Sequence, residues 1–82
     1  MKDIEKRIAQ ILIDELKLED ATAAEFDPQL DLVDELGIDS MDLTAVVLVL
    51  QDEFEISIDE DDYPKLKNVA LIAAYVQERL GS

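Results

Sequence analysis

Ser40 is the residue of this chain best placed to do chemistry. It lies in the run Glu35–Asp42 (ELGIDSMD), at the start of an apolar segment. A serine in that position can cap a helix, act as a nucleophile or accept a covalent group. The 82 residues include no histidine and no cysteine. That composition leaves no partner for a Ser-His or Cys-His pair and none of the common zinc ligand sets. A role of Ser40 as a catalytic nucleophile is thereby excluded, whereas helix capping and covalent modification remain as its possible roles.

The other reactive groups of the chain are mostly carboxylates. Seven basic and 21 acidic residues give a net charge of −14. This charge makes nucleic acids and anionic membrane surfaces unfavourable binding partners and basic protein surfaces favourable ones. A role in solubility alone would also explain it. Neither Asp59–Asp62 nor Asp31–Asp42 has the ligand spacing of an EF-hand loop, so we expect no specific metal site. Loose association of cations with these carboxylates remains open.

The length of the chain predicts a single domain over residues 1–82. A domain this small offers little room for a substrate cleft, so we expect a protein that is not an enzyme. The first residues lack the apolar core of a signal peptide, and no apolar run approaches the length of a membrane span. We therefore expect a cytoplasmic monomer without membrane insertion.

Apolar residues recur at helical spacing in several segments. The first runs from Asp3, a candidate N-cap, to about Leu18. A long connection over Glu19–Ile38 follows, in which apolar residues suggest a loop pinned across the core with a short helical turn near Leu30–Leu36. The sequence therefore predicts an all-α fold, a small three-to-four-helix bundle with a long loop between its first and second main helices.

The segment from Asp39 to about Glu53 is the second main helix. Its apolar stretch Leu43–Leu50 is rich in β-branched residues and is also compatible with a buried strand. However, Asp39 and Asp42 have the spacing of a capping box, and no second strand is evident for pairing. We therefore assign a helix.

The last third of the chain is expected to hold two further helices. The acids of Asp59–Asp62 suit the first turn of a short helix. Pro64 is expected to limit this helix, although a proline within its first turn would be tolerated. Asn68 is expected to cap a last helix that ends near Leu80, with Gly81 past its end.

The helix that begins at Asp39 has two apolar faces. We assign one to the core: Leu43, Val46, Val47, Leu50 and Phe54. The other contains Met41, Thr44, Ala45 and Leu48. A domain this small cannot bury a helix on every side, so we expect the second face to be exposed and to dock a partner. The alternative is that the long connection covers it.

The segment Leu36–Asp42 (LGIDSMD) resembles the phosphopantetheine attachment motif of acyl carrier proteins, commonly written L-G-x-D-S-L. The similarity continues in the acidic helix end Asp52-Glu53-Phe54, in the stretch Ile56-Ser57-Ile58 and in the acidic segment Asp59–Asp62. It covers essentially the whole chain, and its specific part lies between Leu36 and Phe54.

The resemblance implies that Ser40, preceded by Asp39, carries 4′-phosphopantetheine transferred from coenzyme A by a phosphopantetheinyl transferase. Acyl groups would be held on the thiol of this arm and delivered to enzymes of fatty-acid, polyketide or related lipid biosynthesis. Partners of the acyl-ACP synthetase, ketosynthase or acyltransferase type are implied. The residues expected to dock them are Met41, Asp42, Ala45, Leu48 and Asp52. The residues expected to line the acyl pocket are Phe26, Leu32, Val47, Leu50, Ile58, Leu66 and Val69.

The chain departs from the pattern of many fatty-acid carriers at three positions. Ala45 stands where they have a Glu, Gln51 weakens their later acidic patch, and Met41 replaces a Leu. These differences suggest a dedicated rather than a housekeeping carrier. The alternative function is a non-covalent acidic adaptor for a basic partner, which leaves the motif around Ser40 unexplained.

Overall fold

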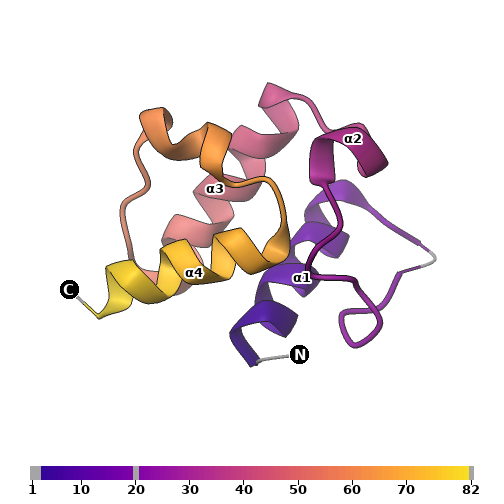
Figure 1. Cartoon of the computed structure of the whole chain (residues 1–82), viewed down its shortest axis with the longest axis horizontal. Coiled ribbons are helices and arrows are strands. Elements are labelled where there is room, and N and C mark those ends of the chain that lie inside the picture. The colour runs from indigo at the N-terminus through magenta and orange to yellow at the C-terminus, as the bar shows by residue number, and fades with distance from the viewer. Residues whose placement is uncertain (1–2, 20, 82) are drawn as a thin grey trace.

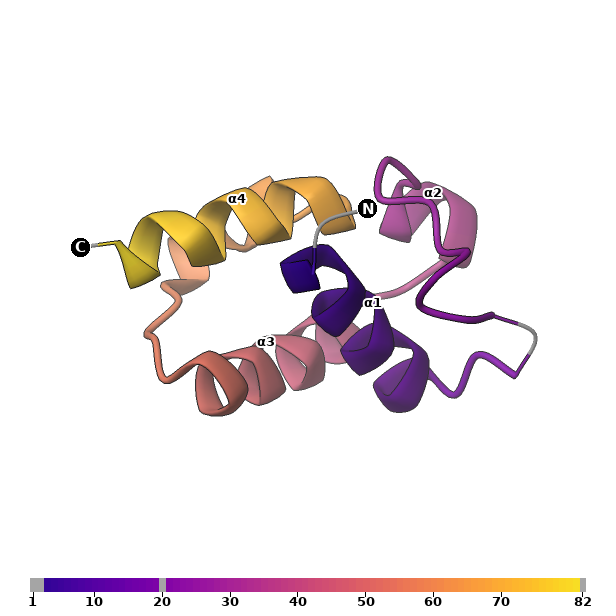
Figure 2. The same cartoon turned by 90° about the horizontal axis from the view of Figure 1, so that it is seen from below.

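A computed structural model describes residues 3–19 and 21–81 of the chain. All regular elements in these ranges are helical, which confirms the predicted all-α fold. They are the α-helices α1 (Asp3–Leu16), α2 (Leu32–Leu36), α3 (Ser40–Phe54) and α4 (Val69–Leu80), and the 3₁₀-helix η1 (Glu60–Lys65). Figure 1 shows α4 crossing in front of α3, and Figure 2 shows α1 beside both of them.

The core lies where α1 packs against α3 and α4. Helix α1 contributes Ile8, Ala9, Leu12 and Ile13, which are buried on one stripe. The predicted core face of α3 is buried at Val46, Val47, Leu50 and Phe54, and Leu43 is half-buried against it. Each large aliphatic side chain in this core stabilises the fold by about 1.5–3 kcal/mol.

The first helix begins at Asp3, as predicted, but it differs from the prediction in the role of that residue and in its last residue. Asp3 is already helical, so it is not the N-cap that its position suggested. The helix ends at Leu16 rather than Leu18, because Lys17 adopts a left-handed conformation with φ 55° that cannot continue an α-helix.

The long connection between α1 and α3 is tied to the rest of the fold, as the apolar residues in it predicted. Two backbone hydrogen bonds join it to the residues around the start of α4. The N–H of Leu32 donates to the carbonyl of Lys67 at 2.9 Å, and the N–H of Ala70 donates to the carbonyl of Pro28 at 2.9 Å. The predicted helical turn is present as α2. Asp31 caps it by accepting from two backbone N–H groups, and Gly37, at φ 67°, ends it.

The other predicted caps are also present. Oδ1 of Asn68 accepts from the N–H of Leu71 at 2.8 Å at the start of α4, and Gly81 follows that helix at its C-terminal end. The acids Glu60, Asp61 and Asp62 lie in the first turn of η1. Pro64 lies inside η1 rather than at its limit, so the short helix continues to Lys65.

Candidate functional site

Ser40 is the first residue of α3, and it is exposed. Asp39 caps the helix, and Asp42 reciprocates in a capping box, as the spacing of the two acids predicted. Asp39 satisfies two donors of the first turn, because its side chain accepts from the N–H of Asp42 and its carbonyl accepts from that of Leu43 at 3.0 Å. The N–H groups of Ser40 and Met41 acquire no such partner within the described residues, and they form part of the positive end of the helix dipole.

This arrangement fits a phosphate ester on Ser40. The serine hydroxyl is accessible, and a phosphate attached to it would sit where unpaired N–H groups and the helix dipole favour negative charge. The hydroxyl of Thr44, one turn further along α3, does not occupy that position. It donates a hydrogen bond to the carbonyl of Ser40 at 2.8 Å. The sequence also offers no cysteine, so a thiol at this site would have to come from an attached group.

The second apolar face of α3 is exposed, as predicted. We call Met41, Thr44, Ala45 and Leu48 the α3 strip. Met41 is 79% exposed and Leu48 58% exposed, so the long connection does not cover the strip. Asp42, which is half-buried, and Asp52, which is exposed, lie on the same helix. Val33 on α2 is a further exposed apolar residue, at 55%, which the sequence interpretation did not single out.

The seven residues predicted to line an acyl pocket are all buried in one hydrophobic cluster. They come from every part of the chain after α1: Phe26, Leu32, Val47, Leu50, Ile58, Leu66 and Val69. One of them, Phe26, also lines a cavity of about 620 Å³ at the end of α1, and the other six do not.

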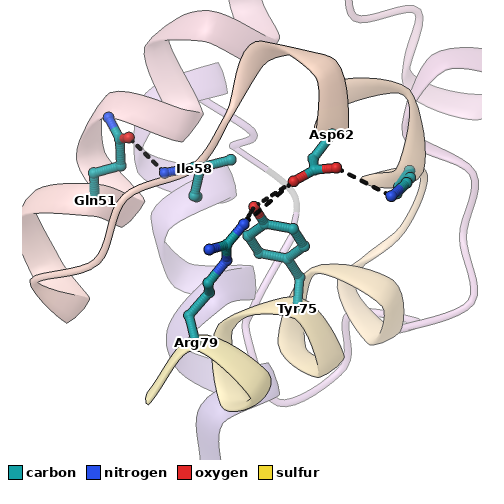
Figure 3. A network of polar contacts seen from close by, with 6 residues as sticks. Gln51, Ile58, Asp62, Tyr75 and Arg79 are labelled. Atoms are coloured by element: carbon teal, nitrogen blue, oxygen red, sulfur yellow. Dashed lines mark hydrogen bonds and ion pairs between the residues drawn. The ribbon is translucent and has the colours of Figure 1, made fainter. Parts of the chain in front are cut away.

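Two sets of polar contacts fix η1 and the segment before it (Figure 3). Oε1 of Gln51 accepts a hydrogen bond from the N–H of Ile58 at 2.8 Å, which ties the segment after α3 back to that helix. The Tyr75 hydroxyl donates to Oδ2 of Asp62 at 2.7 Å, and Arg79 lies 3.4 Å from the same oxygen. These contacts join η1 to α4.

Their electrostatics follow from the geometry. The hydrogen bond from Tyr75, with help from Lys65 at 3.0 Å, lowers the pKa of the Asp62 carboxyl. Burial, and then the bond to Asp62, raises the pKa of the Tyr75 phenol. The sequence interpretation missed this network, although the spacing of Tyr75 and Arg79 by four residues on a helix placed them side by side.

Residues 6–76 match the family described as "Phosphopantetheine attachment site". The chain therefore belongs to that family.

Its similarity to individual proteins points to one branch of the family. It is 36% identical to an acyl carrier protein of Nitratidesulfovibrio vulgaris (strain Miyazaki F) over 93% of this chain and 96% of that one. It is 28% identical to the acyl carrier protein of Solidesulfovibrio magneticus, over 95% and 96% of the two chains. These relatives make it an acyl carrier protein, which carries acyl groups on phosphopantetheine.

Solved structures agree with the fold. A putative acyl carrier protein from Anaplasma phagocytophilum superposes with a TM-score of 0.81 at 25% identity, covering 94% of this chain and 88% of that one. The acyl carrier protein of Enterococcus faecalis gives a TM-score of 0.72 at 26% identity, covering 95% and 99%. Within the described residues, no helix is long and apolar enough to cross a membrane.

Proposed function

We propose that Ser40 is the attachment site of the phosphopantetheine arm, and that Asp39 presents it. The observation that carries this assignment is the exposed serine at the N-terminus of α3, held between two reciprocally capping acids. When attached, phosphopantetheine supplies the terminal thiol that holds acyl groups as thioesters. The protein contributes a fixed backbone, a favourable field for the phosphate and a surface for partner enzymes.

The α3 strip is proposed as that surface. Met41 and Leu48 offer exposed apolar side chains directly behind Ser40, and Asp42 and Asp52 offer charge on the same helix. Exposed apolar groups within a polar surround are typical of interaction sites. The proposed partners are a phosphopantetheinyl transferase, which would modify Ser40, and enzymes of the acyl-ACP synthetase, ketosynthase or acyltransferase type.

The cellular setting is proposed on the same basis. We infer a cytoplasmic monomer that serves fatty-acid, polyketide or related lipid biosynthesis. Ala45 and Gln51, where many fatty-acid carriers are acidic, favour a dedicated pathway over the housekeeping one. The carried chain is proposed to be sheltered against the interior, to which the seven buried residues Phe26, Leu32, Val47, Leu50, Ile58, Leu66 and Val69 belong.

Intact-mass measurement tests the attachment site. The protein is incubated with coenzyme A and a phosphopantetheinyl transferase of broad specificity. We expect the wild type to gain the mass of one phosphopantetheine and Ser40→Ala to gain none. Ser57 is a matched control because it is also an exposed serine, located in the segment between α3 and η1, so Ser57→Ala should be modified like the wild type. Modification of Ser40→Ala would disprove the assignment.

A further inference from the structure

The exposed side of α3 is uncharged over most of the length of the helix. Nine consecutive residues, Leu43–Gln51, include no charged side chain. The exposed residues among them are Thr44, Ala45 and Leu48, and all three belong to the α3 strip. A partner that lies on this side of the helix therefore contacts neutral side chains rather than carboxylates, although the chain as a whole has a net charge of −14.

The polar side chains within this run are bonded inside the chain. The Thr44 hydroxyl donates to the carbonyl of Ser40 at 2.8 Å. The amide oxygen of Gln51 accepts from the N–H of Ile58 at 2.8 Å (Figure 3). Because these groups already have partners, a surface that covers them needs to supply fewer hydrogen bonds of its own.

The three carboxylates of α3 lie toward the two ends of the helix, and two of them have partners within the chain. Asp42 is half-buried and accepts from the N–H of Asp39. Glu53 accepts from the guanidinium of Arg7 at 2.8 Å, so this pair carries no net charge. Asp52 is the one carboxylate of α3 for which the described residues supply no such partner.

Resting on the proposed attachment at Ser40 and on the proposed docking role of the α3 strip, we infer that the phosphopantetheinyl transferase contacts the strip with an apolar surface rather than a basic one. Exposed apolar side chains such as Met41 and Leu48 gain free energy when they are buried against apolar groups. A lysine or arginine opposite them would lose its water without gaining a carboxylate. The net charge of the chain acts at longer range, where it steers the approach of a basic enzyme.

A charge placed in the strip tests this inference, because an apolar and a basic transferase surface predict opposite effects. The variants are Ala45→Glu and Ala45→Met, which add side chains of similar length and similar helix propensity at an exposed position. The KM for the carrier is measured with the transferase from the organism that produces this chain. We expect Ala45→Glu to raise this KM about fivefold or more, because an unpaired charge enters an apolar contact.

The other outcomes of this comparison are equally specific. Ala45→Met should leave the KM unchanged or lower it, because it adds apolar surface to the contact. A lower KM for Ala45→Glu, or equal values for the two variants, would overturn the inference while the attachment at Ser40 stands. A wild-type chain that takes no phosphopantetheine at Ser40 would overturn both proposals.

Two further variants separate the contact from the overall charge. Ala74 is an exposed alanine on α4, and Ala74→Glu changes the net charge as Ala45→Glu does. Its KM should stay close to the wild-type value, and an increase as large as that of Ala45→Glu would overturn the inference. Asp52→Asn removes the carboxylate that has no partner, and it should change the KM little. A severalfold increase in Asp52→Asn would place a basic group of the transferase against α3 and also overturn the inference.

Discussion

Asp39 and Asp42 hydrogen-bond to each other's backbone across the first turn of α3. Oδ1 of Asp39 accepts from the N–H of Asp42 at 2.9 Å, and Oδ2 of Asp42 accepts from the N–H of Asp39 at 3.3 Å. Ser40 lies between them, with its side chain exposed. The structure thus fixes the backbone on both sides of the serine and leaves the serine exposed.

Removing this cap should destabilise the fold by a measurable amount. We expect Asp39→Ala to lower the free energy of unfolding by about 1 kcal/mol, because an N–H of the first turn loses its acceptor. Asp39→Asn should retain most of the stability, since the amide oxygen can accept the same bond. Urea unfolding followed by circular dichroism gives the values.

Asp59 provides the control for this prediction. It occupies the N-cap position of η1 but makes no side-chain capping bond there. Asp59→Ala should therefore change the free energy of unfolding by much less than Asp39→Ala. Equal losses in the two variants would mean that charge, rather than capping, explains the effect at Asp39.

Gln51 should matter for the segment that leads into η1. Gln51→Leu leaves the N–H of the buried residue Ile58 without its acceptor, which costs about 1–3 kcal/mol. Gln51→Glu keeps an acceptor at the same position and should cost less. Hydrogen exchange of the Ile58 amide reports the change directly. It should accelerate strongly in Gln51→Leu and only weakly in Gln51→Glu, and equal acceleration would contradict the assigned role.

Local patterns were sufficient to predict the elements that surround Ser40. The capping box of Asp39 and Asp42 and the cap at Asn68 depend on residues three apart, so sequence alone reveals them. The exposure of Met41 and Leu48 followed from a helix that is apolar on two sides in a domain too small to bury both.

Features that depend on distant segments were not predictable in this way. The Asp62 to Tyr75 bond joins residues thirteen apart on different elements. The cavity at the end of α1 is lined mostly by an irregular connection that has no periodicity to interpret. Gln51 illustrates the difference well. In the sequence, Gln51 is notable only because many fatty-acid carriers are acidic in this part of the helix. In the structure, its amide oxygen accepts a hydrogen bond from Ile58 in the segment that follows α3.

The α3 strip should determine how well partner enzymes recognise the protein. We expect Leu48→Ala to raise the KM of the phosphopantetheinyl transferase about fivefold or more, because a central apolar contact contributes over about 1 kcal/mol to binding. Its kcat should change little, since Ser40 is unaltered. Steady-state kinetics with the variant as substrate measure both constants.

Leu71→Ala is the control that distinguishes an effect on recognition by the transferase from an effect on stability. Leu71 on α4 is 45% exposed, close to the 58% of Leu48. Leu71→Ala should therefore have a similar effect on Tm but leave the KM of the transferase unchanged. A KM increase of the same size in both variants would place recognition outside the strip.

The contact between Asp62 and Tyr75 predicts a specific dependence of stability on pH. The pKa of Asp62 in the folded protein lies below its ordinary value of 3.8, chiefly because Tyr75 donates a hydrogen bond to the carboxylate. A group with a lowered pKa stabilises the fold above its ordinary pKa, and this contribution disappears as the pH falls through the folded-state pKa. The stability difference between wild type and Asp62→Asn should therefore be constant near neutral pH and shrink below about pH 4.

An NMR titration of the Asp62 carboxyl carbon tests the cause of the shift. Tyr75→Phe removes the donated hydrogen bond, so the pKa of Asp62 should rise toward 3.8. Tyr63→Phe is the matched control, because Tyr63 is adjacent in sequence and is not among the groups that shift Asp62. It should leave the pKa where it is in the wild type. If Tyr75→Phe also left it there, the depressed pKa would have to come from Lys65 and Arg79, and α4 would be joined to η1 by charge rather than by the phenol.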